Sequence, residues 1–255
     1  MDGIVSPDVR RYVMAHDLFF LLLFVARLVV FTAAELVRPA RTVIYRKVVF
    51  YDLTAFAVYQ VVIFPLALRI DTWIAVRPHL PDTILAMPLV FRVLCYLIVA
   101  DLGHYWIHRF MHHKRLWRIH KWHHAPDYMY WLMGVRATLP QQVLVNLPYV
   151  VAYSFLALSP WWMVLAVGAA HVLQNDWMHL NVAWPSSRLE WLVVTPRYHH
   201  VHHSDQPEHY KANLAALFTV WDRMFGTYVN PAELRSDLSF GIGERVPPIR
   251  LFLGV

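Results

Sequence analysis

Five long apolar segments dominate this sequence and limit the folds that it can adopt. They run from Asp17 to Val37, from Val48 to Leu68, from Thr83 to about Ile107, from Gln141 to Leu158 and from Pro160 to Leu180. Because a membrane-spanning helix needs roughly 17–25 residues, each segment is long enough to cross a bilayer. Only the dipeptide Ser159-Pro160 marks the boundary between the last two segments. We therefore expect these two to form a tight hairpin that need not cross completely.

The composition favours a membrane protein over a soluble one. Hydrophobic residues make up 58% of the 255 residues and charged residues 16%, against roughly 45–50% and 25% in ordinary soluble domains. Too little polar sequence remains to cover five buried helices in water. We therefore expect an all-α, multi-pass membrane protein with about four to five membrane helices, folded as a single domain over residues 1–255.

Cationic residues are concentrated in two of the connections between the apolar segments. One connection holds Arg38, Arg41, Arg46 and Lys47, and the other holds Arg109, Lys114, Arg115, Arg118, Lys121 and Arg136. The positive-inside rule places both connections in the cytoplasm, at the inner membrane of a bacterium or the endoplasmic reticulum of a eukaryote. The net charge of +6 then fits an anionic membrane surface better than nucleic acid.

The histidines are clustered rather than scattered. Of 16 histidines, 13 lie between His104 and His203. They form three groups whose spacing places the members on one face of a helix. The groups are His104, His108 and His112; His120, His123 and His124; and His199, His202 and His203. The last two apolar segments lie between the second and third groups and return the chain to the same side, so one cytoplasmic, histidine-rich cap is expected.

This clustering predicts a metal site. Neutral imidazole binds iron, zinc, copper and nickel, and about eight such ligands exceed the coordination sphere of one ion, so two metals are expected. Isolated histidines are more often ordinary polar residues, which is our interpretation of His16 and His79. The single cysteine, Cys95, excludes an intramolecular disulfide and a CxxC metal motif,.

Several ordered motifs resemble the fatty acid hydroxylase superfamily, which includes the sterol desaturases. They are Asp101-x-x-x-Tyr105-Trp106-x-His108-Arg109-x-x-His112, Leu116-Trp117-x-x-His120-x-x-His123-His124, Thr195-Pro196-Arg197-x-His199-x-x-His202-His203-Ser204 and Trp221-Asp222-Arg223-x-Phe225-Gly226-Thr227. The resemblance covers a core of about residues 101–228, over half the chain. It implies a membrane-embedded di-iron enzyme that activates O2 and hydroxylates, or sometimes desaturates, an unactivated C–H bond of a lipid.

The resemblance also implies a ligand set. Carried over by position, the ligands are His108, His112, His120, His123, His124, His199, His202 and His203, with His179 from the helix that precedes the last histidine motif. Relatives like the fatty-acid 2-hydroxylases place another histidine where this chain has Asn175, and His171 could substitute for it. His104 shares the ligand face and could be a ligand or a neighbour of one. His113 and His200 fall between the motif positions and are not expected to bind metal.

Two further sets of residues leave alternatives open. Carboxylates near the motifs could orient imidazoles through their N–H groups; these are Asp101, Asp176, Asp205 and Asp222. Asp205 could equally belong to a turn or a helix cap. An aromatic stretch after the second motif could line a lipid channel or form an interfacial belt; it contains Tyr128, Tyr130, Trp131 and Met133.

The expected activity is O2-dependent hydroxylation of a membrane lipid at two iron ions, which zinc could replace in the purified protein. Desaturation at the same site is the alternative within the family. A membrane metal transporter or sensor is the alternative from another class. The sequence contains neither an H-E-x-x-H protease motif nor a glycine-rich dinucleotide motif,. We therefore expect a separate electron donor, resembling cytochrome b5 or a ferredoxin and served by its own reductase.

Overall fold

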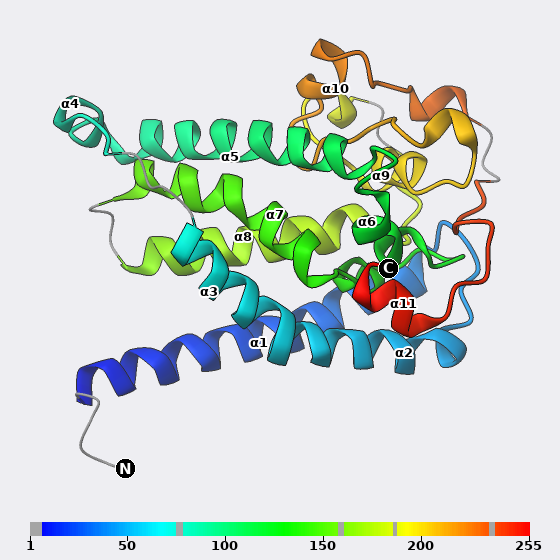
Figure 1. Cartoon of the computed structure of the whole chain (residues 1–255), viewed down its shortest axis with the longest axis horizontal. Coiled ribbons are helices and arrows are strands. Elements are labelled where there is room, and N and C mark those ends of the chain that lie inside the picture. Colours follow the sequence, from blue (N-terminus) through cyan, green and yellow to red (C-terminus); the bar gives the residue numbers. More distant parts are fainter. Residues whose placement is uncertain (1–6, 75–78, 158–160, 186–187, 235–237) are drawn as a thin grey trace.

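The computed structural model describes residues 7–74, 79–157, 161–185, 188–234 and 238–255, and in this part of the chain every regular element is helical (Figure 1). The elements are α1 (Pro7–Val37), α2 (Tyr45–Val58), η1 (Tyr59–Ile63), α3 (Phe64–Ile74), α4 (Asp82–Leu85), α5 (Leu89–Met111), α6 (Trp117–His124), η2 (Trp131–Val135), α7 (Leu139–Ala152), η3 (Tyr153–Leu156), α8 (Trp161–His179), η4 (Leu189–Trp191), α9 (Pro196–His202), η5 (Pro207–His209), α10 (Val220–Met224), η6 (Pro231–Glu233) and α11 (Pro248–Leu253). The all-α prediction is confirmed.

Three helices in the described part of the chain are long and apolar enough to cross a membrane. They cover Leu18–Val37, Tyr45–Asp71 and Leu89–Met111, which correspond to the first three predicted segments. Large apolar side chains on them point outward: Val29 is 62% exposed, Val61 76% and Val90 68%. An outward apolar face suits contact with lipid rather than water.

The second of these helices bends at a single π-helical turn. Tyr59–Ile63 forms this turn between α2 and α3, and Pro65 follows it directly. Proline lacks the N–H that would continue the regular hydrogen-bond pattern, and its ring crowds the preceding turn. The wider π turn accommodates this interruption, so the span continues as a bent helix.

The fourth and fifth predicted segments form α7 and α8, which are not among the three helices that are long and apolar enough to cross a membrane. Helix α7 has only 14 residues, fewer than a straight crossing needs. It packs against α3 and α5, and its Tyr149 ring lies 4.2 Å from the ring of His171 on α8. Polar residues in the second half of α8 (His171, Gln174, Asn175) lower its apolar character. The turn at 158–160 lies outside the described residues.

The remaining short helices gather at one end of the long helices. In Figure 1 this end lies on the right, where α1 and α5 finish, α2 begins, and α6, α9 and α11 pack together. We call this assembly the cap. All three histidine motifs of the sequence are located here, as the predicted return of the chain requires.

The aromatic stretch after α6 is buried rather than exposed as a belt. Tyr130, Trp131 and Met133 are almost completely buried, and they form a core with Leu180. Partly buried Phe24 and other apolar residues of α1 and α2 cover this core. These residues therefore do not form an exposed belt; they join the cap to the two N-terminal helices, and the channel interpretation stays a prediction.

Candidate metal centre

Nine buried histidines form two clusters inside the cap. The five-histidine group consists of His108, His112, His120, His124 and His202. The four-histidine group consists of His123, His179, His199 and His203. Within each group, one ring nitrogen from every residue lies within 4.8 Å of those from all the others. These nine residues are the same nine that the sequence motifs single out.

Helical spacing explains why the second and third histidine motifs each serve both groups, whereas His108 and His112 of the first motif both enter the five-histidine group. In α6, His120 and His124 are one turn apart and enter the five-histidine group, whereas His123 enters the other. The α9 motif reverses the assignment: its first and last histidines join the four-histidine group, and His202 joins the five-histidine group. Residues three and four positions after the first lie on the same broad face of a helix but on opposite sides of the first residue, so they can enter different groups.

The imidazoles within each group face one another through their Nε2 atoms. In the five-histidine group the Nε2 atom of His120 lies 3.1 Å from that of His108 and 3.2 Å from that of His124. In the four-histidine group the Nε2 atom of His199 lies 3.2 Å from that of His179 and 3.0 Å from that of His203. Each group therefore directs several nitrogens toward one small space.

The opposite ring nitrogen of four of these histidines bonds to a backbone carbonyl. The Nδ1 atom of His108 donates to Leu214 O at 2.7 Å, and that of His202 donates to Ala212 O at 2.9 Å. In the other group, Nδ1 of His179 donates to Asn175 O at 2.6 Å. Nδ1 of His123 similarly donates to the carbonyl of Arg136 at 3.2 Å. A proton held on Nδ1 leaves the Nε2 lone pair free for a metal ion.

Burial keeps the imidazoles of the cap neutral. It is the largest cause that lowers their pKa well below the usual 6.5, and the neighbouring imidazoles add to the effect. The residues concerned are His112, His120, His123, His124, His199, His202 and His203. Neutral imidazole is the form that binds metal, so the site is ready for a cation at neutral pH.

The donor set fits a metal ion in each group. Imidazole nitrogens bind zinc at about 2.0–2.1 Å, so two ligands on one ion stand roughly 3.0–3.4 Å apart. The Nε2 separations of 3.0–3.3 Å match that spacing. The buried Nε2 atoms of His112 and His202 have no hydrogen-bond partner among the described residues. Facing lone pairs and unpartnered nitrogens are stabilised when a cation lies between them.

The structure corrects the expected role of two carboxylates. Asp101 and Asp222 make no bond to an imidazole; they hold the segment that supplies the carbonyl for His108. Asp101 accepts the N–H groups of Leu217 and Phe218 at 2.9 and 2.8 Å. Asp222 accepts the N–H of Leu214 at 2.8 Å. The two carboxylates therefore orient the ligand through a backbone segment.

The other two carboxylates are also away from the imidazoles. Asp176 accepts a 2.5 Å bond from Arg27 of α1, and both side chains are buried. Asp205 accepts from Ser239 Oγ at 2.7 Å, beside a backbone bond between the same residues. Asp205 therefore joins two segments that are distant in sequence, and its interpretation as part of a turn or a helix cap stays a prediction. The carbonyl of Asn175 receives the N–H of His179.

The remaining histidines lie outside both groups. His104 bonds through Nδ1 to Tyr149 OH at 2.9 Å, and its ring is 5.9 Å from that of His108. His171 bonds to Tyr96 OH at 2.5 Å. His200 is buried against Arg41, with 2.9 Å between Nδ1 and Nη1. His79 and His113 are exposed, and the side chain of His16 lies outside the described part of the chain.

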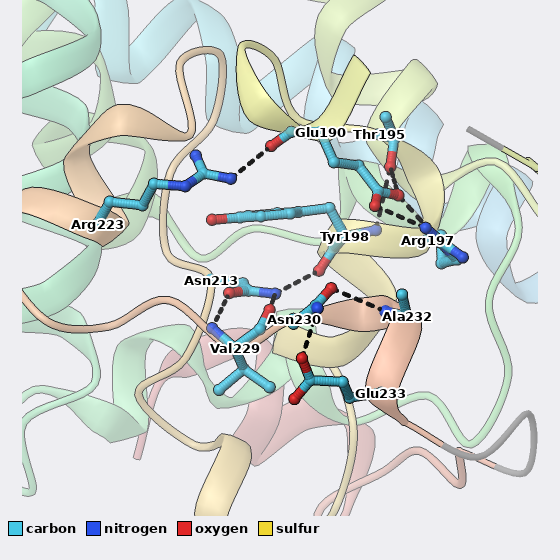
Figure 2. A network of polar contacts seen from close by, with 10 residues as sticks. All are labelled: Glu190, Thr195, Arg197, Tyr198, Asn213, Arg223, Val229, Asn230, Ala232 and Glu233. Atoms are coloured by element: carbon cyan, nitrogen blue, oxygen red, sulfur yellow. Dashed lines mark hydrogen bonds and ion pairs between the residues drawn. The ribbon is translucent and has the colours of Figure 1, made fainter. Parts of the chain in front are cut away.

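A polar network fixes helix α9, which carries two of the nine histidines and ends directly before a third, His203 (Figure 2). Thr195 caps the helix: its Oγ1 accepts the N–H of Tyr198 at 3.2 Å and donates to Glu190 at 2.8 Å. Arg197 reaches both oxygens of the same carboxylate, at 3.0 and 2.7 Å. Asn213 donates to the Tyr198 carbonyl at 3.2 Å and adopts a left-handed φ of 51°, which asparagine tolerates better than most residues.

Sequence reasoning missed the supports that come from the first two membrane helices. Glu35 of α1 accepts the N–H groups of Trp131 and Asn181, both at 2.8 Å. Asp52 of α2 pairs with Arg136 at 2.5 Å, and the carbonyl of Arg136 holds His123. Charged residues inside apolar spans are costly and usually functional. That signal was present in the sequence and would have identified Glu35 and Asp52.

A glycine is required beside His179. A methyl group added to Gly134 would lie 2.5 Å from Nδ1 of that imidazole and 2.8 Å from its Cγ. Separations under 3.0 Å force a neighbour to move. Any larger residue at position 134 would therefore displace the ring that bonds to Asn175.

Comparison with known proteins identifies a matching family and several relatives of this chain. The model of the family described as "Fatty acid hydroxylase" matches residues 93–227. The alkylglycerol monooxygenase of Danio rerio is 35% identical over 139 residues, which are 52% of this chain and 30% of that protein. The ornithine lipid hydroxylase OlsE of Rhizobium tropici is 30% identical over 165 residues, 62% of this chain and 48% of that protein.

A more distant relative acts on a sterol by name. The lathosterol oxidase of Homo sapiens is 29% identical over 160 residues, 60% of this chain and 50% of that protein. The matches thus cover half or less of the length of each of these relatives. No solved structure matches the chain.

Proposed function

Because the chain belongs to the fatty acid hydroxylase family, we propose that it is an integral membrane enzyme that hydroxylates a C–H bond of a membrane lipid with O2 at two metal ions. The observation that carries this proposal is the pair of buried histidine groups, whose Nε2 atoms face one another at 3.0–3.3 Å. Two separate groups of five and four histidines provide ligands for two ions.

The expected metal is iron. Imidazoles of the five-histidine group would hold one ion and those of the four-histidine group the other. Bound iron would supply the oxidising power that no protein side chain has. In the overall reaction a C–H bond and O2 take up two electrons and two protons, and they give an alcohol and water.

The protein itself contributes position and exclusion of water. Backbone carbonyls at Leu214, Ala212, Asn175 and Arg136 hold four imidazoles in one tautomer. All nine histidines are at most 9% exposed. A reactive centre in such a site is protected from bulk water and side reactions. The three apolar helices end at the cap, so a lipid can approach the site without leaving the bilayer.

The substrate class follows from what the relatives share. Their names specify an alkylglycerol, an ornithine lipid and a sterol, which differ in headgroup but are all membrane lipids. We propose a membrane lipid as the substrate and hydroxylation as the reaction. Desaturation at the same site is the second candidate, because removal of two hydrogens needs the same first C–H cleavage.

An oxygen-18 experiment tests the function and separates these reactions. The protein would be loaded with ferrous iron in nanodiscs made from the lipids of the expressing cells, reduced with dithionite and exposed to ¹⁸O2. Hydroxylation predicts a lipid product that carries one oxygen-18 atom, whereas desaturation predicts a product that has lost two hydrogens and gained no label. His108→Ala should abolish the product, and His79→Ala, at an exposed position, should retain it. Absence of any O2-dependent lipid product in the unaltered protein would contradict the proposal.

A metal transporter remains the alternative from another class. Transporters place their ion sites near the middle of the membrane, whereas these histidines lie in the cap at one end of the long helices. Lipid oxidation coupled to O2 consumption favours the enzyme. Metal uptake into sealed vesicles, without lipid oxidation, would favour the transporter.

We further propose that the cap faces the cytoplasm, where reductants are available. Thiol labelling tests this in a variant whose only native cysteine, Cys95, has been replaced. Lys114→Cys and Arg197→Cys should react with an impermeant reagent only after the membrane is opened. Arg77→Cys, at a position outside the described residues, should react in intact cells. Labelling at 114 in intact cells would contradict a cytoplasmic cap.

A further inference from the structure

Trp117 is an aromatic residue that lies between the surface and the five-histidine group. It is the first residue of α6 and is partly exposed. Its ring centroid lies 5.2 Å from that of His112, 5.2 Å from that of His124 and 6.2 Å from that of His120. One indole therefore contacts three of the five imidazoles that would bind the first metal ion.

The site comes nearest to the surface at this place. Among the nine clustered histidines, His112 has the largest exposed fraction, 9%, whereas His179 is 0% exposed and His199 and His203 are each 2% exposed. The turn from His113 to Leu116 follows His112 directly and is exposed along its length. A partner protein on this turn would thus be close to the five-histidine group and farther from the four-histidine group.

A cationic rim surrounds Trp117. It consists of Lys114, Arg115 and Arg118, which are all exposed. No ion pair among the described residues involves any of the three. Lys121, one turn later, is paired with Glu244 and is not counted in the rim. Three unneutralised cations next to an aromatic residue form a surface that attracts an acidic protein.

From these observations we propose that Trp117 and its cationic rim form the docking and electron-entry site for an acidic one-electron carrier protein. This inference rests on the proposed oxygenase function, which consumes two electrons for each O2. The carrier delivers them in two steps, and its own cofactor is oxidised by one electron in each. The indole is not reduced itself; it fills the gap between carrier and imidazoles, and electron tunnelling falls steeply with the width of such a gap.

A second cationic surface in the chain provides a matched control. Arg38, Arg46 and Lys47 are exposed. Arg38 lies in the connection between α1 and α2, and Arg46 and Lys47 lie in the first turn of α2, at the same end of the long helices. Reversal of three charges there changes the net charge as much as reversal of the rim. A general attraction to the membrane side or to anionic lipid would respond to both changes, whereas a defined docking site responds only to the rim.

The first experiment measures carrier binding. The full chain in neutral-lipid nanodiscs is titrated with a purified acidic [2Fe–2S] ferredoxin and, separately, with the soluble haem domain of a cytochrome b5-like protein. Replacement of Lys114, Arg115 and Arg118 by Glu should weaken binding of the recognised carrier roughly tenfold or more, and added salt should weaken binding to the unaltered protein. The same replacement of Arg38, Arg46 and Lys47 should change binding less than twofold. Equal effects of both triple variants, or no effect of the rim variant, would overturn the proposal.

The second experiment separates the role of Trp117 from that of the rim. With the reduced carrier in excess, stopped-flow absorbance follows its oxidation by the metal-loaded protein. Trp117→Leu should slow this step about tenfold while carrier affinity and metal content stay unchanged, and Trp117→Phe should restore most of the rate. Unchanged electron transfer in Trp117→Leu would overturn the entry role. The entry role would also be overturned by a second result: Trp117→Leu loses metal, and Trp117→Phe restores the metal but not the rate of electron transfer.

Failure of this inference differs from failure of the proposed function. Dithionite reduces the site without a carrier, so dithionite-driven lipid oxidation should be equal in the unaltered protein and the rim variant. If dithionite-driven oxidation persists while the rim variant binds the carrier as well as the unaltered protein does, the proposed docking site is wrong and the oxygenase function stands. If dithionite supports no lipid oxidation in the unaltered protein, the proposed function itself fails.

Discussion

The five-histidine group is held by the third membrane helix and the cap, whereas the four-histidine group is held by the first two membrane helices. In the first case Asp101 and Asp222 bind the backbone around Leu214, which in turn bonds to His108. In the second case the carboxylates of Glu35 on α1 and Asp52 on α2 bind the Asn181 N–H and the Arg136 side chain. The two groups therefore obtain the same imidazole geometry from different parts of the chain.

This difference shows what the buried charges of the membrane helices do. The Asp52–Arg136 pair has side chains that are 0% and 6% exposed. Such a pair contributes little net stability, but the loss of one partner leaves an uncompensated buried charge. The pair therefore fixes the carbonyl of Arg136 beside His123 and ties the four-histidine group to the bilayer-embedded part of the fold.

Exchange of single ligands gives the largest expected effect and tests the division directly. His123 and His124 are neighbours in sequence but belong to different groups. Either residue changed to Ala should lower lipid oxidation by on the order of 100-fold or more, because even supporting residues are worth roughly 10–100-fold at metal sites. Spectra of the cobalt-substituted protein should lose different bands in the two variants. Identical spectral losses would mean that the nine histidines form one undivided site.

Removal of the charge on Asp52 should have the next largest effect. In Asp52→Asn, Arg136 stays buried without its counter-charge, and this should destabilise the protein by about 3–5 kcal/mol. Thermal unfolding in detergent measures the change. The pair of Lys121 and Glu244, whose side chains are 20% and 58% exposed, is the control, because Glu244→Gln should change stability by less than about 1 kcal/mol. Similar losses in both variants would show that the network of Asp52 has no special structural role.

A methyl group beside His179 should disturb only the four-histidine group. Gly134→Ala places a carbon 2.5 Å from the ring, so the imidazole must move away from its Asn175 carbonyl. Affinity for the metal of that group should fall roughly 10–100-fold, as it does when supporting bonds are lost. Competition with a chromogenic chelator measures it. Retention of both metals at full affinity would contradict the close packing of Gly134 on His179.

The pH dependence of stability should affect both groups alike. Burial lowers the pKa of His112 and His199 well below 6.5, so the folded metal-free chain resists protonation while the unfolded chain takes up protons near pH 6.5. Stability is therefore complete above that pH and falls as the pH drops below it, by about 1.4 kcal/mol per unit for each such histidine. Denaturant unfolding of the metal-free protein between pH 5 and 8 tests the sign. Greater stability at pH 5 would contradict a neutral, buried cluster.

The sequence predicts the first three spans and eight of the nine clustered histidines because both depend on local periodicity, whereas His179 was predicted only from the family resemblance. Apolar runs of sufficient length and histidines at i, i+3 and i+4 can be read without knowing the tertiary structure. The division into two groups could not be predicted this way. It depends on how α6 and α9 pack across each other, which brings His202 to His124 and His203 to His123.

The supports were predicted less well than the ligands. Carboxylates near the motifs were expected to bind imidazoles, but backbone carbonyls fill that role at His108 and His123. A carbonyl leaves no mark in the sequence, since every residue has one. The hydropathy pattern could not predict that α7 is short, because the apolar run continues past the end of α7 into the 3-10 turn η3 (Tyr153–Leu156).

The most direct test of the account is a metal count on the purified protein. Elemental analysis of the unaltered chain should give about two metal ions per polypeptide, as iron or, after overexpression, as zinc, which competes well for imidazole sites. His123→Ala should lower the count by weakening the four-histidine group, while His79→Ala should leave it at two. A saturating count of one or none in the unaltered chain would contradict the two-metal centre and the function proposed from it.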